Sequence, residues 1–163
     1  MTSRAFAVLG VQQIALGSLD RTALRQLWVD CLGLTPIGTF ASRDENVDEE
    51  ILELRSPLGP LGVVEFDLMQ PVDPAARPKT HEPALNHVGL WIDDLRAAVA
   101  WLVAHGVRIA PGGIRRGAGG HEICFIHPRP SEFFPICGNG VLIELVQAPE
   151  ELVRRHAAMR SGR

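Results

Sequence analysis

The sequence predicts an α+β fold in which two copies of one β-α-β-β-β module follow each other along the chain. The main observation is an internal repeat. In each copy a polar residue leads a short apolar strand, an aspartate follows seven residues later, and a glycine closes a helical stretch. These positions are Gln13, Asp20 and Gly33 in the first copy, and His87, Asp94 and Gly106 in the second.

A helix is expected after the first strand of each module. Asp20 and Asp94 suit its N-cap, because their carboxylates can accept hydrogen bonds from the amides of the first helical turn. Gly33 and Gly106 suit the left-handed conformation just past a helix end. Apolar residues recur at helical spacing and define the buried faces: Leu24, Leu27, Trp28 and Cys31 in the first stretch, and Leu95, Ala98, Val99 and Leu102 in the second.

Each module closes with an apolar strand that contains an acid. We predict these closing strands over residues 63–69 and 141–146. Shorter strands are expected over residues 50–54 and 123–126, between the helix and the closing strand of each half. We expect each half to have the order β-α-β-β-β, with these strands among its members.

The boundaries follow from these elements and from the proline pattern. The first module covers residues 8–71 and the second covers 85–149. Residues 72–84 are a linker, since proline removes amide donors and stiffens the chain. Residues 150–163 form a charged C-terminal tail to which we assign no chemistry.

Composition excludes several function classes. The 163 residues carry a net charge of −3, which argues against a nucleic-acid partner because phosphate binding needs a dense basic patch. The scattered Cys31, Cys124 and Cys137 indicate reduced thiols, not a disulfide framework or a zinc knuckle. No apolar run reaches the roughly 18 residues of a membrane span, and no signal-peptide pattern opens the chain. We therefore expect a cytoplasmic protein with no membrane partner.

Polar residues share one face of the predicted strands. Strand alternation places Gln13, Glu65 and Asp67 opposite the apolar face in the first module, and His87 and Glu144 likewise in the second. A single acid in a closing strand is more often an exposed residue, and a single histidine at the start of a strand is more often structural. The recurrence in both modules favours a metal site, because carboxylates within apolar strands are costly unless paired or metal-bound. Imidazole nitrogen with carboxylate or amide oxygen suits Co, Ni, Mn, Fe or Zn.

Four short motifs give the chain a family resemblance. The motifs are Leu-Asn-His-Val-Gly-Leu at 85–90, Gly-Ala-Gly-Gly-His at 117–121, Phe-Ile-His-Pro at 125–128 and Gly-Val-Leu-Ile-Glu-Leu-Val-Gln at 140–147. With the repeated polar positions, the chain resembles the vicinal oxygen chelate superfamily over nearly its whole length, and through these motifs its second half is similar to methylmalonyl-CoA epimerases.

The resemblance implies paired modules that form a cupped, mostly antiparallel sheet around one divalent metal ion. The implied ligands are Gln13, Asp67, His87 and Glu144. Epimerase-like members usually carry histidine at the first ligand position, whereas glutamine there is similar to many glyoxalase I enzymes. Asp67 is one methylene shorter than the usual glutamate or glutamine, and Glu65 is the alternative ligand if the register slips by two.

The implied chemistry is removal of a proton from a carbon beside a carbonyl or thioester. A metal would stabilise the charge of the resulting enediolate, and a carboxylate on each face of the carbon would act as base and then acid. Glu144 is the expected base as well as a ligand. Glu49 is the expected second carboxylate, although residues 48–50 read equally well as a solvated acidic turn.

Four residues are candidates for substrate binding, and three of them have a plainer alternative. Gly119 lies in a glycine-rich turn that could hold a thioester or phosphate through its amides, or could be only a hairpin loop. Arg115 could meet acidic groups of a CoA or glutathione moiety, or could be simply exposed. Trp91 could wall a pocket. Phe133 could cover an acyl chain, and a dimer contact explains it equally well.

The leading hypothesis is a divalent-metal-dependent isomerase that acts on an acyl thioester. The alternative is a lactoylglutathione lyase of the glyoxalase I type, which uses the same enediolate logic. An extradiol dioxygenase would favour two histidines and one glutamate at the metal. A non-catalytic binding protein is disfavoured by His87 together with Glu144. We expect a homodimer, with the site either within one chain or across two.

Overall fold

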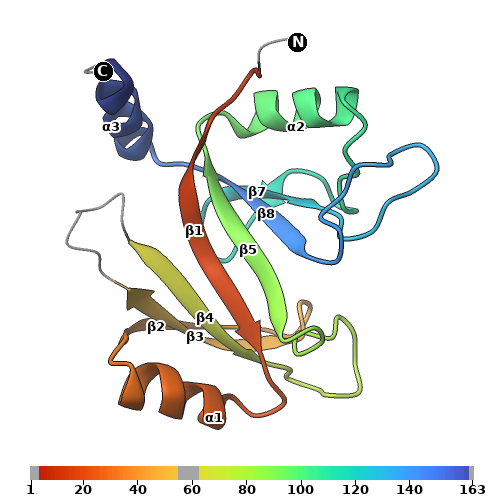
Figure 1. The fold of residues 1–163 in the computed structure, drawn as a ribbon. Coiled ribbons are helices and arrows are strands. Elements are labelled where there is room, and N and C mark those ends of the chain that lie inside the picture. Colours follow the sequence, from red (N-terminus) through yellow and green to blue (C-terminus); the bar gives the residue numbers. More distant parts are fainter. Residues whose placement is uncertain (1–3, 55–62, 162–163) are drawn as a thin grey trace. The chain divides into compact units, whose positions relative to one another are not determined.

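The computed structural model describes residues 4–54 and 63–161 (Figure 1). The chain divides into two compact units. The first-half unit is Gln12–Val88, and the second-half unit joins Met1–Val11 to Gly89–Arg163. Residues 55–62, within the predicted first module, and 162–163, at the end of the predicted tail, lie outside the described residues.

The first-half unit holds most of the predicted first module. Its sheet has the strand order β2-β3-β4-β1, in which β4 pairs parallel to β1 and the other pairs are antiparallel. The elements are β1 (Val8–Gly17, of which the residues up to Val11 belong to the second-half unit), α1 (Arg21–Arg25), η1 (Gln26–Cys31), β2 (Thr35–Ser42), β3 (Val47–Leu54) and β4 (Val64–Gln70).

The second-half unit repeats this plan. Its strand order is β5-β8-β7-β6, so the first strand of the module again lies beside the last. The antiparallel pairs β6–β7 and β7–β8 complete a mostly antiparallel α+β fold, as predicted. The elements are β5 (Leu85–Ile92, which begins in the first-half unit), α2 (Leu95–Ala104), β6 (Arg115–Arg116), β7 (Glu122–Ile126), β8 (Leu142–Gln147) and α3 (Glu150–Ser161).

The helix starts and ends follow the local signals. The Asp20 carboxylate accepts a hydrogen bond from the Thr22 amide at 2.8 Å, and the Asp94 carboxylate accepts one from the Ala97 amide at 2.9 Å. Gly33 and Gly106 have φ angles of 77° and 80°, which an L side chain rarely adopts. Both N-caps and both glycine ends are therefore confirmed.

The first helix departs from the predicted face. The Leu32 amide donates to the Leu27 carbonyl, five residues back, so the helix continues as the π-helix η1. A π turn holds more residues than an α turn, which shifts the phase of every side chain that follows. The prediction that Leu27 and Cys31 are buried is wrong, since both are exposed, and the helix residues that contact the core are Leu24, Trp28 and Val29.

The apolar face of the first-half sheet packs as expected. Phe66 and Leu68 of β4 join Leu52 of β3 in one core cluster, with Ile14 and Leu16 of β1 packed against it. The rings of Trp28 and Phe66 lie 4.7 Å apart. Because successive strand residues face opposite ways, the residues between these positions face the other side of the sheet.

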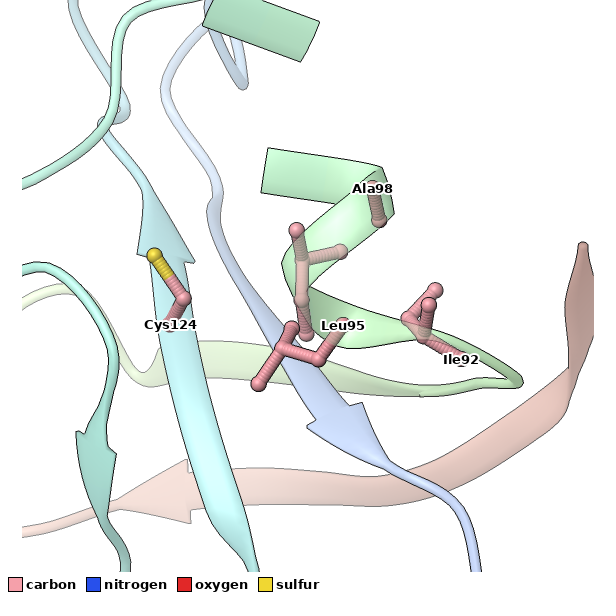
Figure 2. Close-up of a cluster of buried hydrophobic side chains, with 5 residues drawn as sticks. Ile92, Leu95, Ala98 and Cys124 are labelled. Carbon is pink, nitrogen blue, oxygen red and sulfur yellow. The ribbon is translucent and has the colours of Figure 1, made fainter. Parts of the chain in front are cut away.

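The second-half unit has its own core beneath α2. Figure 2 shows Leu95 and Ala98 of the helix beside Ile92 of β5 and Cys124 of β7. Leu145 of β8 completes this cluster, and Val99 and Leu102 pack against it. The predicted buried face of this helix is confirmed. No disulfide joins the cysteines, all three of which lie in the described residues.

The predicted linker lies within the first-half unit. Asn46, in the turn between β2 and β3, donates from its amide to the carbonyls of Asp73 and Pro78 and accepts from the Asp73 amide. These bonds fasten the proline-rich segment to that turn. Among the described helices, none is long and apolar enough to cross a membrane.

The end of β1 makes a close backbone approach to this segment. A Cβ on Gly17 would collide with the Thr80 carbonyl oxygen, whereas a Cβ on Gly10 of the same strand would meet nothing within 4 Å. The Gly17 amide also donates to the Ala84 carbonyl at 2.7 Å. Only a residue without a side chain fits at this crossing.

We predict that Gly17→Ala lowers the free energy of unfolding by about 1–3 kcal/mol, the usual cost of overpacking a filled site. Gly10→Ala, in the same strand, is the matched control and should change it far less. Urea unfolding followed by circular dichroism measures both. Equal midpoints for the two variants would contradict the close approach.

Candidate functional site

Buried polar side chains lie on the face of the first-half sheet that turns away from α1. The register pairs Glu65 of β4 with Gln13 of β1, and Asp67 with Ala15. His87, at the start of β5, is 8% exposed and Asp67 is 4% exposed. Strand alternation thus gathers in one unit the four polar residues that the sequence predicted for this half and for the head of β5.

Of these groups, the Asp67 carboxylate has the least compensated charge. In the described part of the chain its Oδ1 is buried and has no hydrogen-bond partner. Burial, and secondly the negative charge of Glu65, raises the pKa of Asp67 to about 7. A buried carboxylate is costly without a compensating donor or cation, so this oxygen is suited to a positive ligand.

Glu65, the alternative ligand, has a different setting. Its Oε2 accepts a hydrogen bond from the side-chain amide of Gln12 at 2.9 Å. Burial raises the pKa of Glu65, while the Gln12 bond opposes that rise. Glu65 is less buried than Asp67, and its carboxylate already has a donor.

The His87 ring is held at both nitrogens. Its Nε2 lies 2.5 Å from the Gln13 side-chain nitrogen, and its Nδ1 lies 2.9 Å from Oδ1 of Asn86. Burial lowers the pKa of His87 to about 4, so the ring is neutral at physiological pH. A neutral imidazole is the form that binds a metal ion.

Glu49 lies on a buried strand position, not in a solvated turn. It is 7% exposed on β3, and its register partner is Met69 of β4. Its neighbours face the helix instead: Asp48 pairs with Arg21 at 3.0 Å and Glu50 pairs with Arg25 at 3.1 Å. Alternation therefore places Glu49 alone of this acidic run on the face that carries Asp67.

Glu144 lies on β8, the closing strand of the second-half unit, as Asp67 lies on β4, the closing strand of the first. It is 6% exposed on β8, between Ile143 and Leu145, both of which pack with the core beneath α2. Its register partner on β7 is Phe125. The carboxylate therefore lies on the face of this sheet that turns away from α2.

Two of the predicted substrate-binding residues share that face. The guanidinium of Arg115 lies over the Phe125 ring, 5.0 Å from its centroid, within range of a cation–π contact. Trp91 alternates with the core residues Leu90 and Ile92, and its ring meets the His121 ring edge-on at 5.2 Å. The unit thus places an arginine, two aromatic rings and an acid on one surface.

The other two candidates lie in connecting segments. Gly119 is in the turn between β6 and β7, closed by a hydrogen bond from the Gly117 amide to the His121 carbonyl. Phe133 is 81% exposed. Its segment runs beside residues 106–108 through hydrogen bonds of Ile136 with Gly106 and Arg108.

Sequence reasoning missed Asn86 and Gln12, the residues that contact His87 and Glu65. Each immediately precedes a predicted ligand, His87 or Gln13, and this shared position in the repeat was the available signal. His121 was noticed only as the end of a glycine-rich motif, yet its ring contacts Trp91.

The donor set of the first-half unit fits a divalent cation. It offers an imidazole nitrogen, a carboxylate oxygen that lacks a donor, and the side-chain amide of Gln13. In residues 4–54 and 63–161 no three His, Cys, Asp or Glu side chains gather into one metal-binding group. Glu144 belongs to the second-half unit, and its part in such a site stays a prediction.

Known proteins similar to this chain include methylmalonyl-CoA epimerases. The mitochondrial methylmalonyl-CoA epimerase of Dictyostelium discoideum is 32% identical over 94 residues, which are 58% of this chain and 47% of that protein. The chain thus matches about half the length of this relative.

Solved structures show the same fold. The methylmalonyl-CoA epimerase of Mycobacterium tuberculosis superposes with a TM-score of 0.69 at 26% identity, covering 94% of this chain and 97% of that one. A methylmalonyl-CoA epimerase in complex with methylmalonyl-CoA and NH4+ superposes with a TM-score of 0.70 at 22% identity, covering 87% of this chain and 96% of that one. A family model described as the Glyoxalase/Bleomycin resistance protein/Dioxygenase superfamily matches residues 12–125, which confirms the predicted resemblance, and the chain belongs to this superfamily.

Proposed function

We propose that this protein is a divalent-metal-dependent epimerase that moves a proton at the carbon beside an acyl-CoA thioester, as the names of its relatives suggest. The observation that carries the proposal is the set of Gln13, Asp67 and His87, in which Asp67 and His87 are buried, the imidazole is neutral and one carboxylate oxygen lacks a donor. Similarity to methylmalonyl-CoA epimerases in sequence and in fold supports the substrate class.

His87, Asp67 and Gln13 would hold the metal, with Glu144 as the fourth ligand. Co, Ni, Zn, Mn and Fe all accept this mixture of nitrogen and oxygen donors. The ion would supply positive charge to the oxygens of an enediolate as that charge develops. Asp67 would then bind a cation in place of a proton, which relieves the cost of its burial.

Two carboxylates would move the proton. An epimerisation needs an acid–base group on each face of the carbon, so that one removes the proton and the other returns it. Glu144 and Glu49 are both buried acids on the sheet faces that turn away from the helices. We assign Glu144 as the first base and Glu49 as its counterpart.

The thioester would lie against the surface that carries Glu144. The Arg115 guanidinium, fixed over Phe125, would meet an acidic group of the substrate, and Trp91 would wall the acyl group. The amides around Gly119 are the candidate contacts for the thioester oxygen. Phe133, which is exposed, would cover the acyl chain or contact the second subunit of a homodimer.

A lactoylglutathione lyase activity is the second candidate. One observation favours it. Gln13, which contacts His87, stands where epimerase-like members usually have histidine and where many glyoxalase I enzymes have glutamine. The acid–base logic at the carbon is the same for both substrates. Assays with both substrates therefore separate the two candidates.

We expect the purified protein to bind one divalent ion and to exchange the α-proton of methylmalonyl-CoA in deuterated buffer. Chelation should abolish the exchange, and adding Co²⁺ back should restore it. Elemental analysis and proton NMR measure the two quantities, with the glutathione–methylglyoxal adduct tested in parallel. Protein that binds no metal and acts on neither substrate would refute both candidates.

Glu144→Gln should lower the exchange rate by about 10²–10⁴-fold, the usual contribution of a general base, because the amide cannot accept the proton. Glu49→Gln should slow exchange from one epimer more than from the other. Glu50→Gln is the matched control, since Glu50 pairs with Arg25 on the helix-facing side of the same strand. Full activity in Glu144→Gln would show that the base lies elsewhere.

Asp67→Asn should weaken Co²⁺ binding by more than about 100-fold, because it removes the charge of a ligand, whereas losing an outer-shell partner costs about 10–100-fold. Glu65→Gln should weaken it less, because Glu65 already accepts a hydrogen bond from Gln12. Isothermal titration of the metal-free protein measures both affinities. The reverse order would move the ligand from Asp67 to Glu65.

A further inference from the structure

Asn86 connects the proline-rich segment to the His87 ring. Its side-chain nitrogen donates to the Thr80 carbonyl at 2.9 Å, and its Oδ1 lies 2.9 Å from Nδ1 of His87. All three residues belong to the first-half unit.

The Thr80 carbonyl fixes the orientation of the Asn86 amide. A carbonyl oxygen can only accept, so the NH2 group of Asn86 must face Thr80. The amide oxygen of Asn86 is thereby turned toward His87. An oxygen acceptor at this distance requires that Nδ1 of His87 carries the proton.

The Gln13 contact agrees with this tautomer. The Gln13 side-chain nitrogen can only donate, and it lies 2.5 Å from Nε2 of His87. A hydrogen bond between these two nitrogens requires a lone pair on Nε2. The Asn86 contact therefore assigns the proton to Nδ1, and the Gln13 contact fits a lone pair on Nε2.

The position of Thr80 is itself fixed by its surroundings. Thr80 is buried, and its hydroxyl donates to the Asn46 carbonyl. Asn46 also binds the backbone of Asp73 and Pro78, and Gly17 passes against the Thr80 carbonyl. A hydrogen bond to the β2–β3 turn and the close approach of Gly17 in β1 therefore hold the acceptor that orients Asn86.

We infer that Asn86 is a positioning residue, which holds His87 in the Nδ1–H tautomer so that Nε2 is the ligand atom. The segment that spaces the two modules is thus also part of the scaffold of the metal site. The part of this inference that concerns metal affinity rests on the proposed metal site, whereas the part that concerns the tautomer does not. Ligating histidines commonly donate their second ring N–H to such an acceptor, which fixes the ring and the tautomer.

The first test reads the tautomer directly, in metal-free wild-type protein that needs no variant to fold. Two-dimensional 15N–1H NMR of the imidazole rings distinguishes Nδ1–H from Nε2–H, and the His87→Gln variant assigns the signal by its loss. We expect the Nδ1–H pattern. An Nε2–H pattern would overturn the inference whatever the protein binds.

The second test compares two substitutions. Asn86→Asp keeps an oxygen acceptor at His87, and should keep the Nδ1–H tautomer. Asn86→Leu has a similar size and no acceptor, and should lose that preference and weaken Co²⁺ binding by about 10–100-fold, the usual cost of losing an outer-shell partner. Thermal unfolding shows whether each variant is folded.

The outcomes separate this inference from the proposed function. Folded Asn86→Leu protein that keeps both the wild-type tautomer and wild-type Co²⁺ affinity would overturn the role of Asn86. If Asn86→Leu does not fold, two other results decide whether the inference stands. These are the tautomer of the wild-type protein and the tautomer of Asn86→Asp, and both are expected to be Nδ1–H. Wild-type protein with the Nδ1–H tautomer but no Co²⁺ binding would refute the metal site and leave the tautomer assignment standing.

Discussion

The cost of burying polar groups in apolar strands is the constraint on which the candidate site depends. His87 meets that cost through hydrogen bonds at both ring nitrogens, to Asn86 and Gln13. Asp67 does not, because its Oδ1 has no donor among the described residues and its pKa is raised to about 7. A carboxyl group with that pKa retains a proton about half of the time at neutral pH, so a cation that replaced the proton would bind where the fold already disfavours a bare charge.

Much of this arrangement could be predicted because it depends on short-range patterns. Strand alternation and the internal repeat located Gln13, Asp67, His87 and Glu144 and the apolar faces opposite them. The π-helix could not be predicted, because the apolar spacing from Leu24 to Cys31 fits an α-helix. In the structure Val29 packs against the core beside Trp28, whereas Leu27 and Cys31 are exposed. The position of Asn86 against Thr80 was equally hidden, because it depends on how a proline-rich segment folds back on the β2–β3 turn.

The acidic residues 48–50 of β3 show why the structure was needed to choose among candidate acids. Asp48, Glu49 and Glu50 are equivalent by composition, and all of them fit a solvated turn. Once they lie on a strand, alternation separates them, and the arginines of α1 pair with Asp48 and Glu50. Those ion pairs satisfy two of the charges on the helix-facing side and leave Glu49 as the buried acid of the other face.

The residue before each candidate ligand differs between the two modules, and this difference bears on which acid would serve the proposed site. Asn86 precedes His87 and binds its ring, whereas Gln12 precedes Gln13 and donates to Glu65. The Gln12 bond stabilises the charge of Glu65 in place, and that charge in turn raises the pKa of Asp67. The same position of the repeat thus contacts the candidate nitrogen ligand in one module and supplies Glu65 with a donor in the other. Asp67 is left as the carboxylate that a cation would stabilise most.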